Sequence, residues 1–149
     1  LWHISRPYNY YPFTFIQADC LEILQDLDYL RTFDVIAASP PCQTHSRTQH
    51  LRNAQGKSTD KVDLIPQTRE ALIASGKPYV IENVPGAPLI NPVQFCGSSF
   101  DLKVRRHRLF ESSIKIVGSI CDHKTQGKPV GIYGSMRDEI PGGGIPQRL

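Results

Sequence analysis

The sequence predicts a single α/β domain with a mostly parallel sheet. Strand-like and helix-like segments alternate along the first part of the chain, which is typical of parallel strands joined by helical crossovers. The 149 residues are enough for one domain with a hydrophobic core and too few for two. Of these residues, 40% are hydrophobic and 21% are charged, as in ordinary globular proteins. No run reaches the roughly 18 apolar residues that span a bilayer, and no secretion signal opens the chain, so we expect a cytoplasmic protein without a membrane partner.

The first elements are a short strand and a helix. Residues 13–17 alternate aromatic and β-branched side chains, which indicates a strand. Asp19 stands where a helix N-cap is expected, and Glu22 follows three residues later, as in a capping box. The helix then has one apolar face, formed by Leu21, Leu24, Leu27 and Leu30.

Two further strands flank a long loop and a second helix. The apolar run 33–38 predicts a strand covered on both faces, which ends at Ser39-Pro40-Pro41 because proline has no amide donor. Residues 44–60 are polar and basic and predict a loop. A helix is expected over 63–75 and a buried strand over 79–81. After Pro92, short apolar runs separated by turns predict strands and irregular structure.

Three polar residues follow these predicted strands. Asp19, Cys42 and Glu82 each come directly after a strand-like segment. In parallel sheets the carboxyl ends of the strands meet at one rim, where binding sites gather. We therefore expect the three side chains to lie along one rim.

Cys42 and Glu82 have the chemistry for covalent attack on a pyrimidine ring. Cys42 follows two prolines and precedes a basic loop, where positive surroundings favour the reactive thiolate. The alternative is a small buried hydrophobic side chain, the usual fate of a free cysteine. Glu82 can protonate a ring nitrogen as a carboxylic acid. The alternative for Glu82 is a local structural hydrogen bond.

Basic residues form two groups, while the formal net charge is only +3. In the first, Arg47 and Arg52 belong to the loop after Cys42. In the second, Arg106 and Arg108 could point to one side of a strand and either grip phosphate or orient a carboxylate. Solvated charge on the surface is the alternative for both groups.

The cysteines indicate reduced thiols. The four cysteines are widely spaced and form no Cys-x-x-Cys pair: they are Cys20, Cys42, Cys96 and Cys121. No secretion signal accompanies them, so disulfides are not expected. Cys121 and His123 could bind zinc together with Cys96, but the sequence does not indicate a fourth ligand. We therefore expect no metal.

Three motifs in order resemble those of the DNA cytosine-5 methyltransferases. They are Ser39-Pro40-Pro41-Cys42-Gln43, Glu82-Asn83-Val84 and Arg106-His107-Arg108. The likeness extends from about Tyr8 to Gly134 and is greatest to the small members from actinobacterial phages. It implies a Rossmann-like methyltransferase fold, incomplete at both termini. Residues 1–92 would form the α/β catalytic core, and 93–149 the remaining strands and a small C-terminal region of the same domain.

The resemblance implies a role for each catalytic residue. Cys42 would attack carbon 6 of a cytosine flipped out of double-stranded DNA. Glu82 would protonate ring nitrogen 3, and Asn83 would help to hold the loop. Arg106 and Arg108 would support Glu82 and the covalent intermediate.

The resemblance also implies a cofactor and a DNA surface. S-adenosyl-L-methionine would supply the methyl group, with Asp19 and Cys20 near its adenine and Pro41 near its methionine end. Asp19 could equally serve as the helix cap, and the two roles are compatible. The residues expected at the DNA are Pro40, Gln43, Ser46, Arg47 and Arg52.

The chain departs from the family pattern at the cofactor site. The glycine-rich loop should precede residue 1, and neither His3 nor Ile4 suits the acidic position that holds the ribose. Val104 replaces a glutamine, and nothing after Ile145 resembles the closing helix. We therefore expect the enzyme to need a longer chain or a complementing polypeptide. Two alternatives are a DNA-binding remnant without cofactor affinity and an enzyme that modifies free pyrimidine nucleotides.

Overall fold

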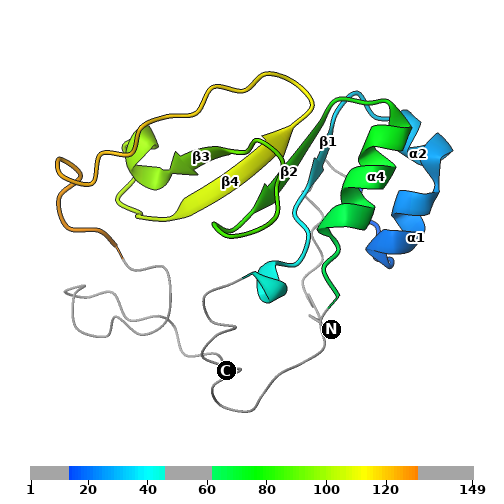
Figure 1. Ribbon diagram of the computed structural model, residues 1–149, viewed down its shortest axis with the longest axis horizontal. Coiled ribbons are helices and arrows are strands. Elements are labelled where there is room, and N and C mark those ends of the chain that lie inside the picture. The colour runs from blue at the N-terminus through cyan, green and yellow to red at the C-terminus, as the bar shows by residue number, and fades with distance from the viewer. Residues whose placement is uncertain (1–13, 46–61, 131–149) are drawn as a thin grey trace, which may run out of the picture.

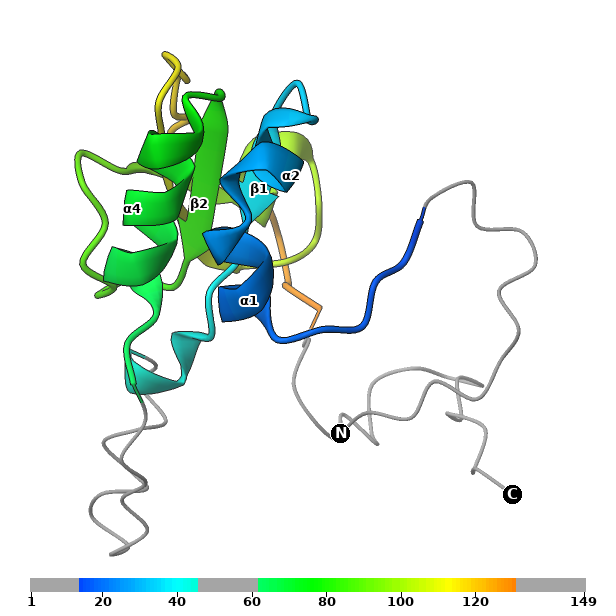
Figure 2. The same ribbon diagram turned by 90° about the vertical axis from the view of Figure 1, so that its right-hand side faces the viewer.

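The computed structural model describes residues 14–45 and 62–130, which form a small α/β fold with a mixed, open sheet (Figures 1 and 2). The helices are α1 (Cys20–Gln25), α2 (Leu27–Arg31) and α4 (Ile65–Ser75), with 3₁₀ turns η1 (Cys42–Thr44) and η2 (Gly97–Phe100). The strands are β1 (Ile36–Ala38), β2 (Tyr79–Asn83), β3 (Val93–Cys96) and β4 (His107–Ser112). None of the helices in these two ranges has the length and apolar character to cross a membrane.

The strand order is β1-β2-β4-β3, and only β1 and β2 are parallel. The prediction of a mostly parallel sheet is therefore wrong. A parallel pair needs a long crossover, usually through a helix, and within the described strands only the connection through α4 provides one. After β2 no further α-helix joins the described strands, and β4 pairs antiparallel with both β2 and β3.

The predicted first helix is present but divided. Asp19 caps α1 by accepting a hydrogen bond from the Leu21 amide at 2.8 Å, so its role as a helix cap is confirmed. Asp26 ends α1 and caps α2 by accepting from the Tyr29 amide at 2.9 Å. The leucine face continues across this break, and Leu30 is buried.

The strand predicted over 13–17 is not formed in its described part, residues 14–17. Phe15 is 79% exposed, and no neighbouring strand pairs with this segment within the described ranges. An alternating pattern alone does not make a strand, because the backbone groups need a partner strand. Asp19 therefore follows no strand, contrary to expectation.

Helices α1, α2 and α4 cover one face of the sheet (Figure 2). The core between the layers is centred on Leu72, Tyr79 and Ile81, with Leu24 and Leu89 packed around it. Helix α4 begins two residues after its predicted start and ends at Gly76, which adopts a left-handed conformation with φ 71°. The predicted helix over 63–75 and the buried strand over 79–81 are thus confirmed.

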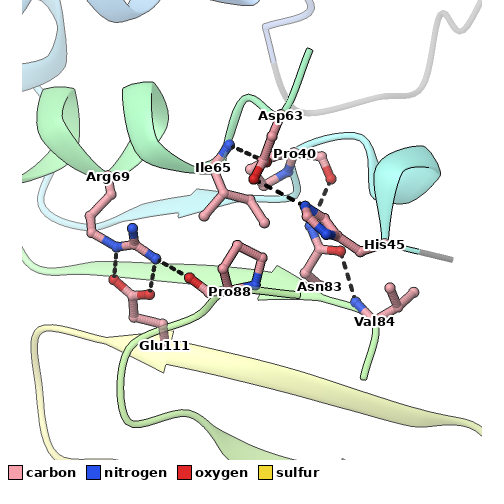
Figure 3. A network of polar contacts seen from close by, with 9 residues as sticks. All are labelled: Pro40, His45, Asp63, Ile65, Arg69, Asn83, Val84, Pro88 and Glu111. Atoms are coloured by element: carbon pink, nitrogen blue, oxygen red, sulfur yellow. Dashed lines mark hydrogen bonds and ion pairs between the residues drawn. The ribbon is translucent and has the colours of Figure 1, made fainter. Parts of the chain in front are cut away.

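A buried ion pair fastens α4 to the sheet (Figure 3). Arg69 donates from Nε and Nη2 to the two carboxylate oxygens of Glu111 on β4, at 2.7 and 2.8 Å. Glu111 is only 3% exposed and also accepts from the Ile90 amide at 2.7 Å. Burial alone would raise the pKa of the Glu111 carboxyl, but the hydrogen bonds from Arg69 and Ile90 lower it below its usual value.

Removing Arg69 should destabilise the fold strongly near neutral pH. Because Arg69→Ala leaves a buried carboxylate without its partner, we expect a loss of about 3–5 kcal/mol in the free energy of unfolding at pH 7. The folded-state pKa of Glu111 is lowered, so the pair's contribution is present above the unfolded pKa of about 4.3 and is lost as the pH falls through the folded value. The difference in the free energy of unfolding between Arg69→Ala and wild type should therefore become smaller at acidic pH. Urea unfolding at several pH values measures it.

Arg31→Ala is the matched control for this prediction. Arg31 pairs with Asp28 at the surface, where the two side chains are 51% and 94% exposed, so its loss should cost no more than about 1 kcal/mol. Equal losses for the two arginine variants would contradict the assigned role of the Arg69–Glu111 pair.

Candidate functional site

Cys42 lies at the first position of η1, in the turn that follows β1. Pro40 is buried and Pro41 is exposed, and the Cys42 side chain is half-buried. The His45 amide donates to the Cys42 carbonyl at 3.1 Å and closes the turn. The prolines end the strand as the sequence predicts, and the thiol follows directly.

Asn83 ties this turn to the end of β2 (Figure 3). Its Nδ2 donates to the Pro40 carbonyl at 3.0 Å, and its Oδ1 accepts from the Val84 amide at 2.9 Å. Asn83 is 1% exposed, so these hydrogen bonds form away from water. The contact joins two of the three predicted motifs, and it agrees with the expected role of Asn83 in holding the loop.

Glu82 lies within β2 and points to the opposite face from Asn83, because side chains alternate along a strand. Its Oε1 is 2.5 Å from Nε of Arg108 on β4, in a pair whose side chains are 28% and 19% exposed. The register explains the contact: Glu82 is opposite Phe110, and Arg108 stands two residues away on the same face of β4. Arg108 therefore pairs with the Glu82 carboxylate. Of the two predicted actions of Arg108, gripping phosphate or orienting a carboxylate, this contact corresponds to the second.

The remaining predicted catalytic and DNA-contacting residues are not all brought into this arrangement. Arg106 precedes β4 and is exposed, so it does not share a strand face with Arg108 as expected. Gln43 is exposed within η1. Ser46, Arg47 and Arg52 lie outside the described residues.

An apolar cavity of about 520 Å³ lies beside β1, a size typical of ligand sites. Cys20 and Pro41, two of the predicted cofactor residues, contribute to its wall, together with Leu24, Ile36, Ala38 and Leu72. Asp19 does not line it, and its carboxylate accepts a hydrogen bond at the start of α1. The lining fits the apolar parts of S-adenosyl-L-methionine but includes no carboxylate for a ribose.

A further pair, His45 and Asp63, was not predicted from the sequence. His45 Nε2 lies 3.1 Å from Asp63 Oδ2, with both side chains largely buried, and Asp63 Oδ1 accepts from the Ile65 amide (Figure 3). In the sequence, His45 precedes and Asp63 follows the basic segment 46–61, and the His45 amide is bonded to the Cys42 carbonyl. Nothing in the spacing or composition of the sequence indicates this contact.

Removing the Asn83 amide should loosen the turn that carries Cys42. The hydrogen bond to Pro40 contributes about 0.5–1.5 kcal/mol net, so Asn83→Ala should raise the alkylation rate of Cys42 about two- to tenfold. Peptide mass spectrometry after brief iodoacetamide treatment measures this rate, with the exposed Cys20 in the same molecule as internal reference. Gln94→Ala, at an exposed site on β3, is the control variant. An unchanged Cys42 rate in Asn83→Ala would show that the amide does not hold the turn.

Comparison with known proteins identifies no family. No protein-family model matches the sequence, and no curated protein matches it significantly. A function therefore has to be inferred from the residues of the site and their geometry.

Proposed function

We propose that this chain carries the nucleophile and the proton-donor site of a DNA cytosine-5 methyltransferase. The observation that carries the proposal is the junction at the end of β2. There, Asn83 holds the Pro40 carbonyl two residues before Cys42, while the adjacent Glu82 is oriented by Arg108. The two segments that carry the thiol and the carboxyl group, distant in sequence, are thus joined by a buried hydrogen bond between Asn83 and Pro40.

These groups suit addition to a cytosine ring that has left the base stack. The Cys42 thiolate forms a bond to carbon 6, and the electrons of the 5,6 double bond move toward nitrogen 3. Glu82 donates a proton to that nitrogen, and Arg108 holds the carboxyl group in place during the transfer. Carbon 5 becomes nucleophilic; after it is methylated, loss of its proton to water expels the Cys42 thiolate, and nitrogen 3 returns its proton to Glu82.

S-adenosyl-L-methionine, when bound, supplies the electrophilic methyl group. Cys20 and Pro41 would hold its apolar parts within the cavity beside β1. The carboxylate for its ribose and the glycine-rich loop would come from outside the described residues.

Double-stranded DNA is the proposed substrate. The segment 46–61 contains Arg47, Arg52, Lys57 and Lys61, opposed only by Asp60. His45 and Asp63, which flank this segment in the sequence, lie 3.1 Å apart, and His45 belongs to the turn that begins at Cys42. Phosphate contacts from such a segment would provide affinity that falls steeply with salt.

A DNA-binding remnant is the second candidate. It is favoured by the cavity lining, which lacks a carboxylate, and by the engagement of Asp19 in the helix cap. Titration with S-adenosyl-L-methionine distinguishes the two, using the chain alone and the chain extended by its flanking coding sequence. Absence of binding in both forms would favour the remnant.

Replacing the nucleophile should abolish covalent trapping. In the presence of S-adenosyl-L-methionine, DNA that contains 5-fluorocytosine retains the enzyme adduct after methyl transfer, since fluorine replaces the hydrogen that must then leave carbon 5. We expect wild-type protein to form an adduct resistant to denaturation, mapped to Cys42 by mass spectrometry, and Cys42→Ala to form none. DNA with ordinary cytosine is the control. An adduct that survives the substitution would remove Cys42 from the mechanism.

Replacing the proton donor should slow methylation without weakening DNA binding. Loss of a general acid costs about 10²–10⁴-fold in rate, so Glu82→Gln should lower kcat within this range while DNA affinity stays within about twofold. Transfer of tritiated methyl groups measures the rate, and a filter-binding assay measures affinity. Glu70→Gln, at an exposed site on α4, is the matched control. Unchanged turnover in Glu82→Gln would refute its role.

A further inference from the structure

We propose that Cys96, His107 and His123 form a binding site for a zinc ion. Their ligand atoms all lie within 4.8 Å of one another. Cys96 ends β3, His107 begins β4, and His123 belongs to the irregular segment that follows β4. The site is separate from Cys42 and does not depend on the proposed methyltransferase function.

The sheet itself places two of the ligands together. Cys96 and His107 are directly opposite each other in the antiparallel pairing of β3 with β4. Residues that face each other in this way project to the same side of the sheet with closely spaced β-carbons. The pairing of the strands therefore fixes the spacing of the thiol and the imidazole before any metal binds.

The third ligand lies directly against this pair. His123 Nε2 is 3.2 Å from Cys96 Sγ, and the His123 ring stacks on the His107 ring with centroids 5.1 Å apart. Ligands bound tetrahedrally at about 2.0–2.3 Å are separated by roughly 3.3–3.8 Å. Small side-chain movements would bring all three atoms to these distances.

One buried nitrogen of His107 has no hydrogen-bond partner among the described residues. His107 Nε2 is shielded from solvent and makes no hydrogen bond to the described residues. Leaving a polar atom buried without a partner is costly, and coordination to a metal would satisfy it. The Cys96 thiol is shielded from solvent as well, since Cys96 is only 2% exposed.

The segment that carries His123 is held in place independently of the ligands. Arg105 donates from Nη2 to the carbonyls of His123 and Gly127 at 2.8 and 3.0 Å, and from Nε to the Gln126 side chain at 2.9 Å. Gln126 in turn donates to the Leu102 carbonyl at 2.6 Å. The segment that carries His123 is therefore held against the loop that joins β3 to β4, without helix or strand in residues 113–130.

Thiolate and imidazole are the ligands that zinc prefers in structural sites. The sequence alone indicated Cys96, Cys121 and His123 but no further ligand, whereas the structure adds His107. A water molecule or Cys121, two residues before His123, would complete the tetrahedron. Because His107 directly precedes Arg108, a bound ion would also stiffen the start of the strand that orients Glu82.

Metal analysis of the purified chain tests the proposal. We expect inductively coupled plasma mass spectrometry to find one equivalent of zinc per chain. After the zinc is removed, titration with Co²⁺ should produce the charge-transfer band of a thiolate ligand and the d–d absorption of tetrahedral Co²⁺. Cys96→Ser, His107→Gln and His123→Gln should each weaken Co²⁺ binding at least about tenfold. Cys20→Ser and His45→Gln are the matched controls for thiol and imidazole and should bind as the wild type does.

Two results would overturn the proposal. The first is wild-type protein that contains no zinc after growth in zinc-supplemented medium and shows no thiolate charge transfer with Co²⁺; this measurement needs no substitution, so misfolded variants cannot obscure it. The second is an unaltered charge-transfer band in Cys96→Ser. Cys42→Ala should retain the metal, so failure of the methyltransferase proposal and failure of the metal site are distinguishable.

Discussion

The candidate site depends on the alternation of side chains at the end of β2. Asn83 points toward the helices and holds the Pro40 carbonyl, whereas the preceding Glu82 points to the other face and meets Arg108. Neither contact could form if β2 shifted by one residue, since such a slip would exchange the two faces. The Cys42 turn and the carboxyl group are therefore joined through one peptide unit, and the core that fixes the position of β2 also fixes the site.

Strand β4 connects this site to the rest of the molecule. On one face of β4, Arg108 reaches Glu82; on the other, Glu111 receives Arg69 from α4. The first residue of β4, His107, is directly opposite Cys96 on the neighbouring strand β3. The helix layer, the candidate catalytic carboxylate and the cysteine–histidine cluster thus all depend on the register of a single strand.

Local features of the sequence predicted the helices and most strands of the described part, but not the topology of the sheet. Leucine spacing, the Asp19 cap and Gly76 each act within a few residues, so the local sequence is enough to predict the helices that they define. Strand direction and the absence of a strand at residues 14–17 depend on which segments pair, and no local pattern contains that information. The same holds for single contacts: the motifs predicted that Glu82 and Arg108 cooperate, whereas the Asn83–Pro40 hydrogen bond spans 43 positions. His107 appeared as a ligand only once the register of β3 and β4 was known.

The position of β4 has a consequence for synthesis of the protein. β4 is the last described strand along the chain, yet it lies between β2 and β3 in the sheet. Until Ser112 has left the ribosome, β2 can pair only with β1, and β3 has no partner among the described strands. Unpaired backbone edges of this kind readily join the edges of other chains. The nascent polypeptide is therefore most prone to aggregation after residue 83 has emerged and before residue 112 has followed.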